Sequence, residues 1–90
     1  MKWEWVNNMD RVVYLIDYLV KQMVNEPNVV TVEQAQDEGI YSVINIKVSS
    51  NDMGCIIGKG GNVANAIRTI AQAVAYANGE KKVKVNIDSI

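Results

Sequence analysis

Hydrophobic residues in the first third of the chain recur every three or four positions, a spacing typical of one buried side of a helix. The residues in this stripe are Val12, Leu15, Ile16, Leu19, Val20 and Met23. Asn8 or Asp10 can cap the start of the helix. Because Pro27 cannot continue a helix, we expect it to end near Asn25.

Two segments rich in β-branched residues follow, 29–32 and 40–48, and together they predict a β-hairpin. Gly39, which follows Asp37 and Glu38, supplies the positive φ that the connecting loop needs. The second strand alternates strictly, so its side chains divide between two faces. We expect the core to receive Ile40, Ser42, Ile44, Ile46 and Val48. We expect a wetter face to carry Tyr41, Val43, Asn45 and Lys47.

The second half of the chain predicts two helices and a third strand. Turn and cap residues at 49–52 precede a short helix over 53–57, and a glycine-rich loop over 58–61 interrupts the pattern. A longer helix begins at Asn62 and stops at Asn78-Gly79, where glycine can adopt a left-handed conformation. Its buried face is expected to carry Val63, Ile67, Ile70 and Val74.

The last predicted strand, 82–87, alternates between an apolar and a polar face. Val83, Val85 and Ile87 point inward, whereas Lys82, Lys84 and Asn86 point outward, where the lysines could form a separate patch. The order of elements is then helix, strand, strand, short helix, glycine loop, helix and strand. This order predicts an α+β fold in which helices cover one face of a three-stranded sheet.

Composition narrows the classes of protein to which the chain can belong. Its 90 residues allow one domain, and 49% hydrophobic with 21% charged residues is ordinary for a folded globule. The longest apolar run, Val12 to Ile16, is too short to span a bilayer, and no secretory signal is readable, so we expect a cytoplasmic protein. With one cysteine, Cys55, and no histidine, we expect neither an internal disulfide nor a metal site, and no cofactor.

Charge is distributed unevenly along the chain. The net charge is −1, but residues 1–46 carry three basic and seven acidic side chains, whereas residues 47–90 carry six basic and three acidic ones. An anionic partner responds to the local field rather than to the sum. The second half is therefore the better candidate for such a partner.

The glycine loop itself, Gly58-Lys59-Gly60-Gly61, excludes two nucleotide-binding motifs. A Walker loop fails because only three residues separate Gly54 from Gly58-Lys59, and no Ser or Thr follows. A dinucleotide fingerprint fails because this loop leaves a helix instead of a strand. A Gly-x-x-Gly connection between helices lets a sugar-phosphate chain approach the backbone closely, next to the amides that start the following helix. Turn geometry alone would explain Gly58 and one of the other two glycines, but not Lys59.

The segment 56–61, Ile-Ile-Gly-Lys-Gly-Gly, followed by Ala66-Ile67 and Ile70, resembles the core signature of the KH domain, a module that binds RNA and single-stranded DNA. The order of elements, α-β-β-α-α-β, matches the type II arrangement. The lead-in at 52–54 and the closing strand are most similar to the short, stand-alone bacterial KhpA-type family. The resemblance covers roughly residues 10 to 88, so we expect an N-terminal extension over 1–9 and a KH domain over 10–90.

This resemblance implies a non-enzymatic protein that holds about four nucleotides of single-stranded RNA in a groove beside the loop, and acts as an RNA chaperone or post-transcriptional regulator. Ile56, Ile57 and Ile67 match positions whose apolar side chains form the floor of such a groove or support it from the core. The predicted RNA-binding residues are Ile56, Ile57, Gly58, Lys59, Gly60, Gly61, Asn62 and Arg68. Cys55 and Asn62 stand where the family often has basic residues, so we expect weak binding with a shallow salt dependence.

Two other functions compete with this interpretation. The chain could be a protein-interaction module that forms a homodimer, or a heterodimer with a second, Jag-type KH protein, with RNA binding secondary. Trp3 and Trp5 are expected to pack on the open sheet face, although they could stack on a base or a partner. An enzyme is disfavoured because no histidine is present to activate Cys55, for which packing or mild redox sensitivity is the better interpretation.

Overall fold

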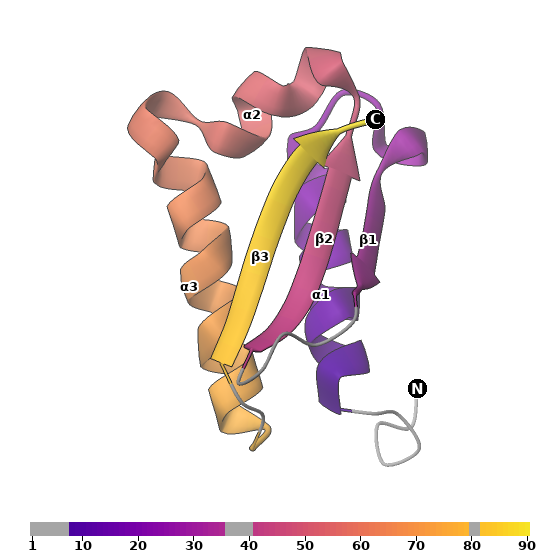
Figure 1. Ribbon diagram of the computed structural model, residues 1–90. Coiled ribbons are helices and arrows are strands. Elements are labelled where there is room, and N and C mark those ends of the chain that lie inside the picture. The colour runs from indigo at the N-terminus through magenta and orange to yellow at the C-terminus, as the bar shows by residue number, and fades with distance from the viewer. Residues whose placement is uncertain (1–7, 36–40, 80–81) are drawn as a thin grey trace.

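The computed structural model describes residues 8–35, 41–79 and 82–90, and describes side-chain surroundings from residue 11 onward. The elements follow the predicted order (Figure 1). They are α1 (Asn8–Met23), β1 (Thr31–Gln34), β2 (Tyr41–Val48), α2 (Met53–Ile57), α3 (Asn62–Ala77) and β3 (Lys82–Ser89), with short 3-10 turns at η2 (Pro27–Val29), η3 (Ser50–Asp52) and η4 (Lys59–Gly61).

The sheet has the strand order β1-β2-β3, so β3 is an edge strand. β1 runs antiparallel to β2, whereas β3 runs parallel to it, with Tyr41 opposite Lys82. A parallel neighbour requires a crossover connection, which here is the segment that carries α2, the glycine loop and α3. In Figure 1, α1 lies behind the sheet and α3 runs along β3, and no helix among the described residues covers the opposite face of the sheet. The predicted α+β fold is confirmed.

The core lies between the sheet and the two long helices. α1 contributes Val12, Ile16 and Val20, and β2 contributes Ile44, Ile46 and Val48, all of them fully buried. The predicted core face of α3 was wrong in part: Ile70 is 39% exposed, whereas Ala64, Ala71 and Ala75 are buried beside Ile67. Small alanine side chains let the helix backbone approach the sheet and α1 closely. The helix therefore turns its alanines toward the core and leaves Ile70 at the surface.

The first strand begins two residues later than predicted, and Pro27 explains the shift. The chain makes a 3-10 turn there, in which the Val29 amide donates to the Glu26 carbonyl and the Val30 amide donates to the Pro27 carbonyl. Because these amides are already bonded, pairing with β2 starts only at Thr31. α1 likewise ends at Met23 instead of Asn25.

From Tyr41 to Val48 the predicted alternation of β2 is confirmed with one exception, and Ile40 lies outside the described residues. Val43 was predicted on the wetter face, yet it is buried and lies outside the core cluster between sheet and helices. The predicted alternation of β3 is also present, and the strand extends to Ser89. The proposed hairpin glycine, Gly39, and the tryptophans Trp3 and Trp5 lie outside the described residues. No helix in the described ranges is long and apolar enough to cross a membrane.

Asp52 has a different structural role from the helix cap that its position suggested. Ser49 does cap the turn η3, since its Oγ accepts from the Asn51 amide. The Asp52 side chain makes no capping bond and is fully buried. Its carboxylate instead accepts from the backbone amides of Asn25 and Glu26, at 3.1 and 3.0 Å, and from Asn25 Nδ2 at 3.2 Å. This contact ties the end of α1 to the start of α2, and so fixes the helix that leads into the glycine loop.

Candidate nucleic-acid interface

The glycine loop makes a sharp turn between α2 and α3. All three of its glycines have positive φ, at 74° for Gly58, 64° for Gly60 and 81° for Gly61. The Gly58 amide donates to the Gly54 carbonyl at 2.9 Å, and the Gly61 amide donates to the Gly58 carbonyl at 3.3 Å. Backbone geometry therefore accounts for all three glycines, which corrects the expectation that it would explain only two. It does not account for Lys59.

Gly58 is constrained by packing as well as by conformation. A Cβ built there would lie 2.4 Å from Val63 Cγ2 and 2.9 Å from the Val63 amide nitrogen. Its ψ of 177°, combined with positive φ, falls in a region that essentially only glycine adopts. Val63 belongs to the first turn of α3, so this contact determines how closely α3 can pack against the glycine loop.

The outer side of the loop is open. Lys59, Gly60 and Asn62 are exposed, and nothing lies within 4 Å of the position that a Cβ would take at Gly60. Among the described residues, no side chain caps the amino end of α3, and its first turn contains no carboxylate. Amides at a helix start, next to a lysine, form an environment that favours a phosphate group.

The apolar residues assigned to the groove differ in accessibility. Ile56 and Ile67 are buried in the core, so they can support a groove only from beneath. Ile57, the last residue of α2, is half-buried and is the more accessible of the two isoleucines that precede the loop. Cys55 is exposed on the same short helix. A ligand beside the loop would therefore meet Ile57 instead of Ile56.

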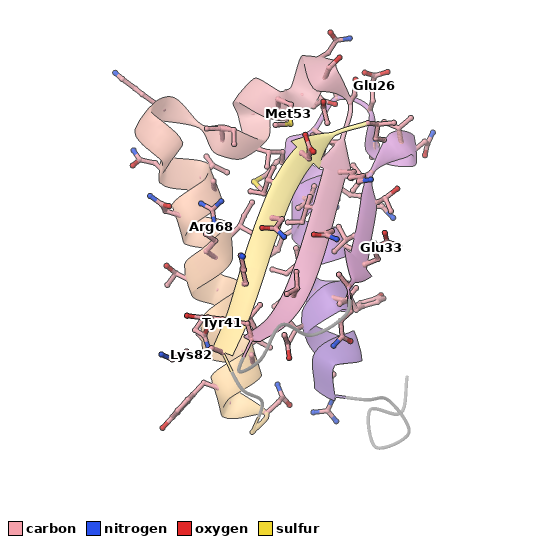
Figure 2. All side chains as sticks on the ribbon, in the orientation of Figure 1. Glu26, Glu33, Tyr41, Met53, Arg68 and Lys82 are labelled. Atoms are coloured by element: carbon pink, nitrogen blue, oxygen red, sulfur yellow. The ribbon has the colours of Figure 1, made fainter. Side chains whose placement is uncertain are left out.

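Arg68 lies on α3 beside the outer edge of β3, as Figure 2 shows. Its Nε donates to the Val85 carbonyl at 3.4 Å, and its Nη1 donates to Asn65 Oδ1 at 3.3 Å. One turn further along α3, Gln72 Oε1 accepts from the Val83 amide at 2.8 Å. Side chains of α3 therefore engage backbone groups along the outer edge of β3.

Sequence reasoning missed Gln72 and Tyr41, which lie close to Arg68 in the fold. One hollow beside Arg68 has a volume of about 670 Å³, and its lining includes Gln72, Tyr76 and Val83. A second hollow has a volume of about 540 Å³, and its lining includes Tyr41, Arg68, Val83 and Lys84. The two hollows meet at Arg68 and Val83. The spacing of Arg68 and Gln72, four residues apart, could have placed them on one side of α3. Nothing in the sequence placed that side against β3.

The predicted residues thus separate into two groups along α3. Gly58, Lys59, Gly60, Gly61 and Asn62 gather at its amino end, whereas Arg68 lies about 10 Å further along, at the usual helical rise. The second half of the chain is more cationic at its surface than its composition indicates, because one of its three acidic side chains, Asp52, is buried. The surface beside the loop and β3 is the best candidate for an anionic ligand.

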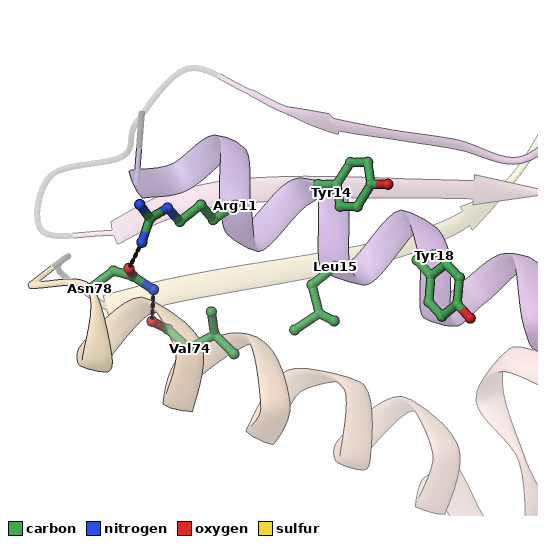
Figure 3. A pocket seen from close by; sticks show the side chains of 6 residues that line it. All are labelled: Arg11, Tyr14, Leu15, Tyr18, Val74 and Asn78. Atoms are coloured by element: carbon green, nitrogen blue, oxygen red, sulfur yellow. Dashed lines mark hydrogen bonds between the residues drawn. The ribbon is translucent and has the colours of Figure 1, made fainter. Parts of the chain in front are cut away.

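A separate cleft lies between α1 and α3, on the helical side of the sheet (Figure 3). It has a volume of about 420 Å³ and is lined mainly by apolar surface from Tyr14, Leu15, Tyr18 and Val74. At one end Arg11 Nη1 donates to Asn78 Oδ1 at 3.0 Å, and Asn78 Nδ2 donates to the Val74 carbonyl at 2.8 Å. Neither the glycine loop nor Arg68 lines this cleft.

Comparisons with known proteins agree with this architecture. The chain is 40% identical over 75 residues to "RNA-binding protein KhpA" of Listeria monocytogenes, covering 81% of this chain and 93% of that relative. It is 39% identical to the protein of the same name from Treponema pallidum, covering 71% of this chain and 79% of that relative. The relative from Clostridium perfringens is 38% identical, with 77% and 91% covered.

A solved structure supports the fold. The crystal structure of Era in complex with MgGDPNP and nucleotides 1506–1542 of 16S ribosomal RNA superimposes with a TM-score of 0.59 at 19% identity. The superposition covers 87% of this chain, which spans 29% of the Era chain. The family model "KhpA/KhpB, KH domain" matches residues 14–87, and so includes α2, the glycine loop, α3 and most of β3. With a type II KH fold, a glycine loop between two helices and these relatives, the chain belongs to the KhpA/KhpB KH-domain family.

Proposed function

We propose that this chain is a non-enzymatic protein that binds single-stranded RNA through the glycine loop and the adjoining surface between α3 and β3. The observation that carries the proposal is the open, positive-φ backbone at Gly60 beside an exposed Lys59. A phosphate can approach the backbone at Gly60 closely without meeting a side chain, and Lys59 supplies a cation. The name of the relatives, RNA-binding protein, supports RNA as the ligand.

The proposed groove runs from the loop along β3 and holds about four nucleotides. Phosphates lie at Lys59, Gly60, Gly61 and Asn62, bases face Ile57, and Arg68 meets the phosphate that leaves the far end of the groove. Binding of this kind suits an RNA chaperone or post-transcriptional regulator acting in the cytoplasm, where its RNA ligands are. Residues 10–90 form the binding domain in this proposal, and residues 1–9 precede it.

The test replaces the loop cation and adds a second carboxylate, by combining Lys59→Asp with Gly60→Asp. We expect binding of single-stranded RNA to weaken at least about tenfold, because two anions face the phosphates where one cation stood. Fluorescence anisotropy with a labelled oligonucleotide of randomised sequence measures the affinity. Circular dichroism and a thermal melt establish that the variant is folded.

A matched control changes the net charge equally at a distant place. Lys21→Asp with Gln22→Asp adds the same negative charge on exposed positions of α1. Binding should then stay within about twofold of the parent. Equal affinity of the folded loop variant and the parent would contradict the proposal.

One observation favours a second function, protein interaction. The cleft between α1 and α3 is mainly apolar, and Tyr14 and Tyr18 are more than half exposed at its rim. A second copy of the chain, or another KH-containing protein, could pack there. Sedimentation analysis separates the two functions. The interaction function is contradicted if the chain binds RNA but remains monomeric and forms no complex with a KH-containing partner.

A further inference from the structure

The two hollows beside Arg68 combine cationic and aromatic side chains. Arg68 and Lys84 contribute the positive charge, and among the described residues no carboxylate lines either hollow. Each hollow also has one exposed tyrosine at its rim, Tyr76 at 81% exposed and Tyr41 at 39%. Figure 2 shows Tyr41 near the start of β2, at the opposite end of the sheet from Met53. Cations next to flat aromatic rings are the features with which proteins hold unpaired bases.

These tyrosines lie far from the glycine loop. Tyr76 follows Gly61 by nearly the whole of α3, which is about 22 Å at the usual helical rise. Near the loop, the described residues that could contact a base are aliphatic, such as Ile57, or polar, such as Asn62. Within the described surface between α3 and β3, the aromatic rings on which a base could stack therefore lie only near the carboxyl end of α3.

The outer edge of β3 is a poor site for a peptide strand. A strand that adds to a sheet needs the backbone amides and carbonyls of the edge. Gln72 already accepts from the Val83 amide, and Arg68 donates to the Val85 carbonyl. The same contacts leave the hollows on either side of Arg68 open. These observations favour a nucleic acid over a protein strand as the ligand.

We propose that Tyr41, Arg68, Tyr76 and Lys84 form a second nucleotide subsite, in which single-stranded RNA that continues past the glycine-loop groove stacks its bases on the two tyrosines. This inference rests on the proposed function, since the loop groove delivers the strand to the subsite. Arg68 stands between the two hollows and neutralises the phosphate that joins them. RNA long enough to reach both regions gains affinity that a four-nucleotide RNA lacks.

The experiment compares four-nucleotide and eight-nucleotide oligouridines on the full chain. Tyr76→Ala should weaken binding of the longer RNA about fivefold or more and leave the shorter one unchanged, because loss of stacking costs about that much per base. Tyr76→Phe should restore binding, since the ring is kept. Tyr41→Leu should act in the same direction as Tyr76→Ala. Tyr18→Ala, at an exposed tyrosine on α1, is the matched control and should change neither affinity.

The possible results separate the two proposals. If Tyr76→Ala and Tyr41→Leu bind the longer RNA as the parent does, while the doubly substituted loop variant described above weakens both lengths, the subsite is wrong and the proposed function stands. If the loop variant changes neither length, the proposed function fails, and with it the delivery of RNA to the subsite. Equal weakening by Tyr18→Ala would also overturn the subsite, because the effect would not be local.

Discussion

Single residues decide the shape of the loop, and Gly58 is the most constrained of them. Its backbone conformation excludes residues with a side chain, and Val63 occupies the space that a Cβ would take. Gly60 is different, since its φ is positive but the space around it is open. Gly58 is therefore constrained by both conformation and packing, whereas Gly60 is constrained by conformation alone.

Gly58→Ala should lower the free energy of unfolding by about 2–4 kcal/mol, because it combines backbone strain with a clash against the first turn of α3. Urea denaturation followed by circular dichroism measures the change. Gly54→Ala is the matched control, since Gly54 is helical and nothing lies within 4 Å of its Cβ position. That variant should be unchanged or up to about 1 kcal/mol more stable. A Gly58→Ala protein as stable as its parent would show that the turn relaxes freely.

At the scale of elements, α3 combines three contacts on one helix. Its amino end follows the glycine loop, its alanine stripe packs into the core, and Arg68 and Gln72 reach the edge of β3. These contacts fix the rotation of the helix about its own axis. A change on the buried stripe should therefore alter the surface beside β3 as well as stability.

Ala71→Leu should destabilise the fold by about 1–3 kcal/mol, because the side chain is fully buried where α3 packs closely. Ala66→Leu, at an exposed position of the same helix, should stay within about 0.5 kcal/mol of the parent. Thermal melts of both variants give the comparison. Similar melting temperatures for the two would mean that the alanine stripe does not require small side chains.

The elements themselves were predictable from the sequence, because each carries a local signal. The spacing of Val12, Ile16 and Val20 predicted α1, and the alternation in 40–48 predicted β2. Burial along α3 was not predictable in the same way, since alanine and isoleucine both suit a buried face and only tertiary packing decides between them. The roles of Asp52 and Gln72 were missed for a similar reason: their partners, Asn25, Glu26 and Val83, lie more than ten residues away in sequence.

The candidate site was predictable only where one short segment contains it. The residues 58–62 are contiguous, so their motif identified the loop directly. Tyr41, Arg68 and Lys84 come from β2, α3 and β3, and the pattern of a single element does not show that they line one hollow. Parallel pairing of β2 with β3, which brings Tyr41 beside Lys82, creates that neighbourhood.

For the molecule as a whole, the distribution of charge limits how strongly an RNA can be held. Lys59 is exposed at the loop, and among the described residues Arg68 and Lys84 are the cations that line the hollows beside β3. α1 carries Asp17 in an ion pair with Lys21, at 2.9 Å, and belongs to the acidic half of the chain. We therefore expect few counterions to be released on binding.

A plot of log affinity against log salt concentration should have a slope of about −2, since each of three neutralised phosphates contributes about −0.7 for a single strand. Lys59→Ala should make the slope shallower by about one such step. Titrations at several potassium chloride concentrations provide the measurement. If Lys59→Ala leaves the slope unchanged, Lys59 does not neutralise a phosphate of the bound RNA.

The parallel pairing of β2 and β3 also has a consequence for how the protein is made. Asn45 and Asn86, whose side chains share a hydrogen bond across the two strands, are 41 residues apart in sequence. Closing so long a segment costs chain entropy before the pairing yields any contacts, which is the pattern of slow-folding topologies. A ribosome delivers the glycine loop and α3 before it delivers β3, so a nascent chain contains the whole loop before the strand that pairs with β2 exists.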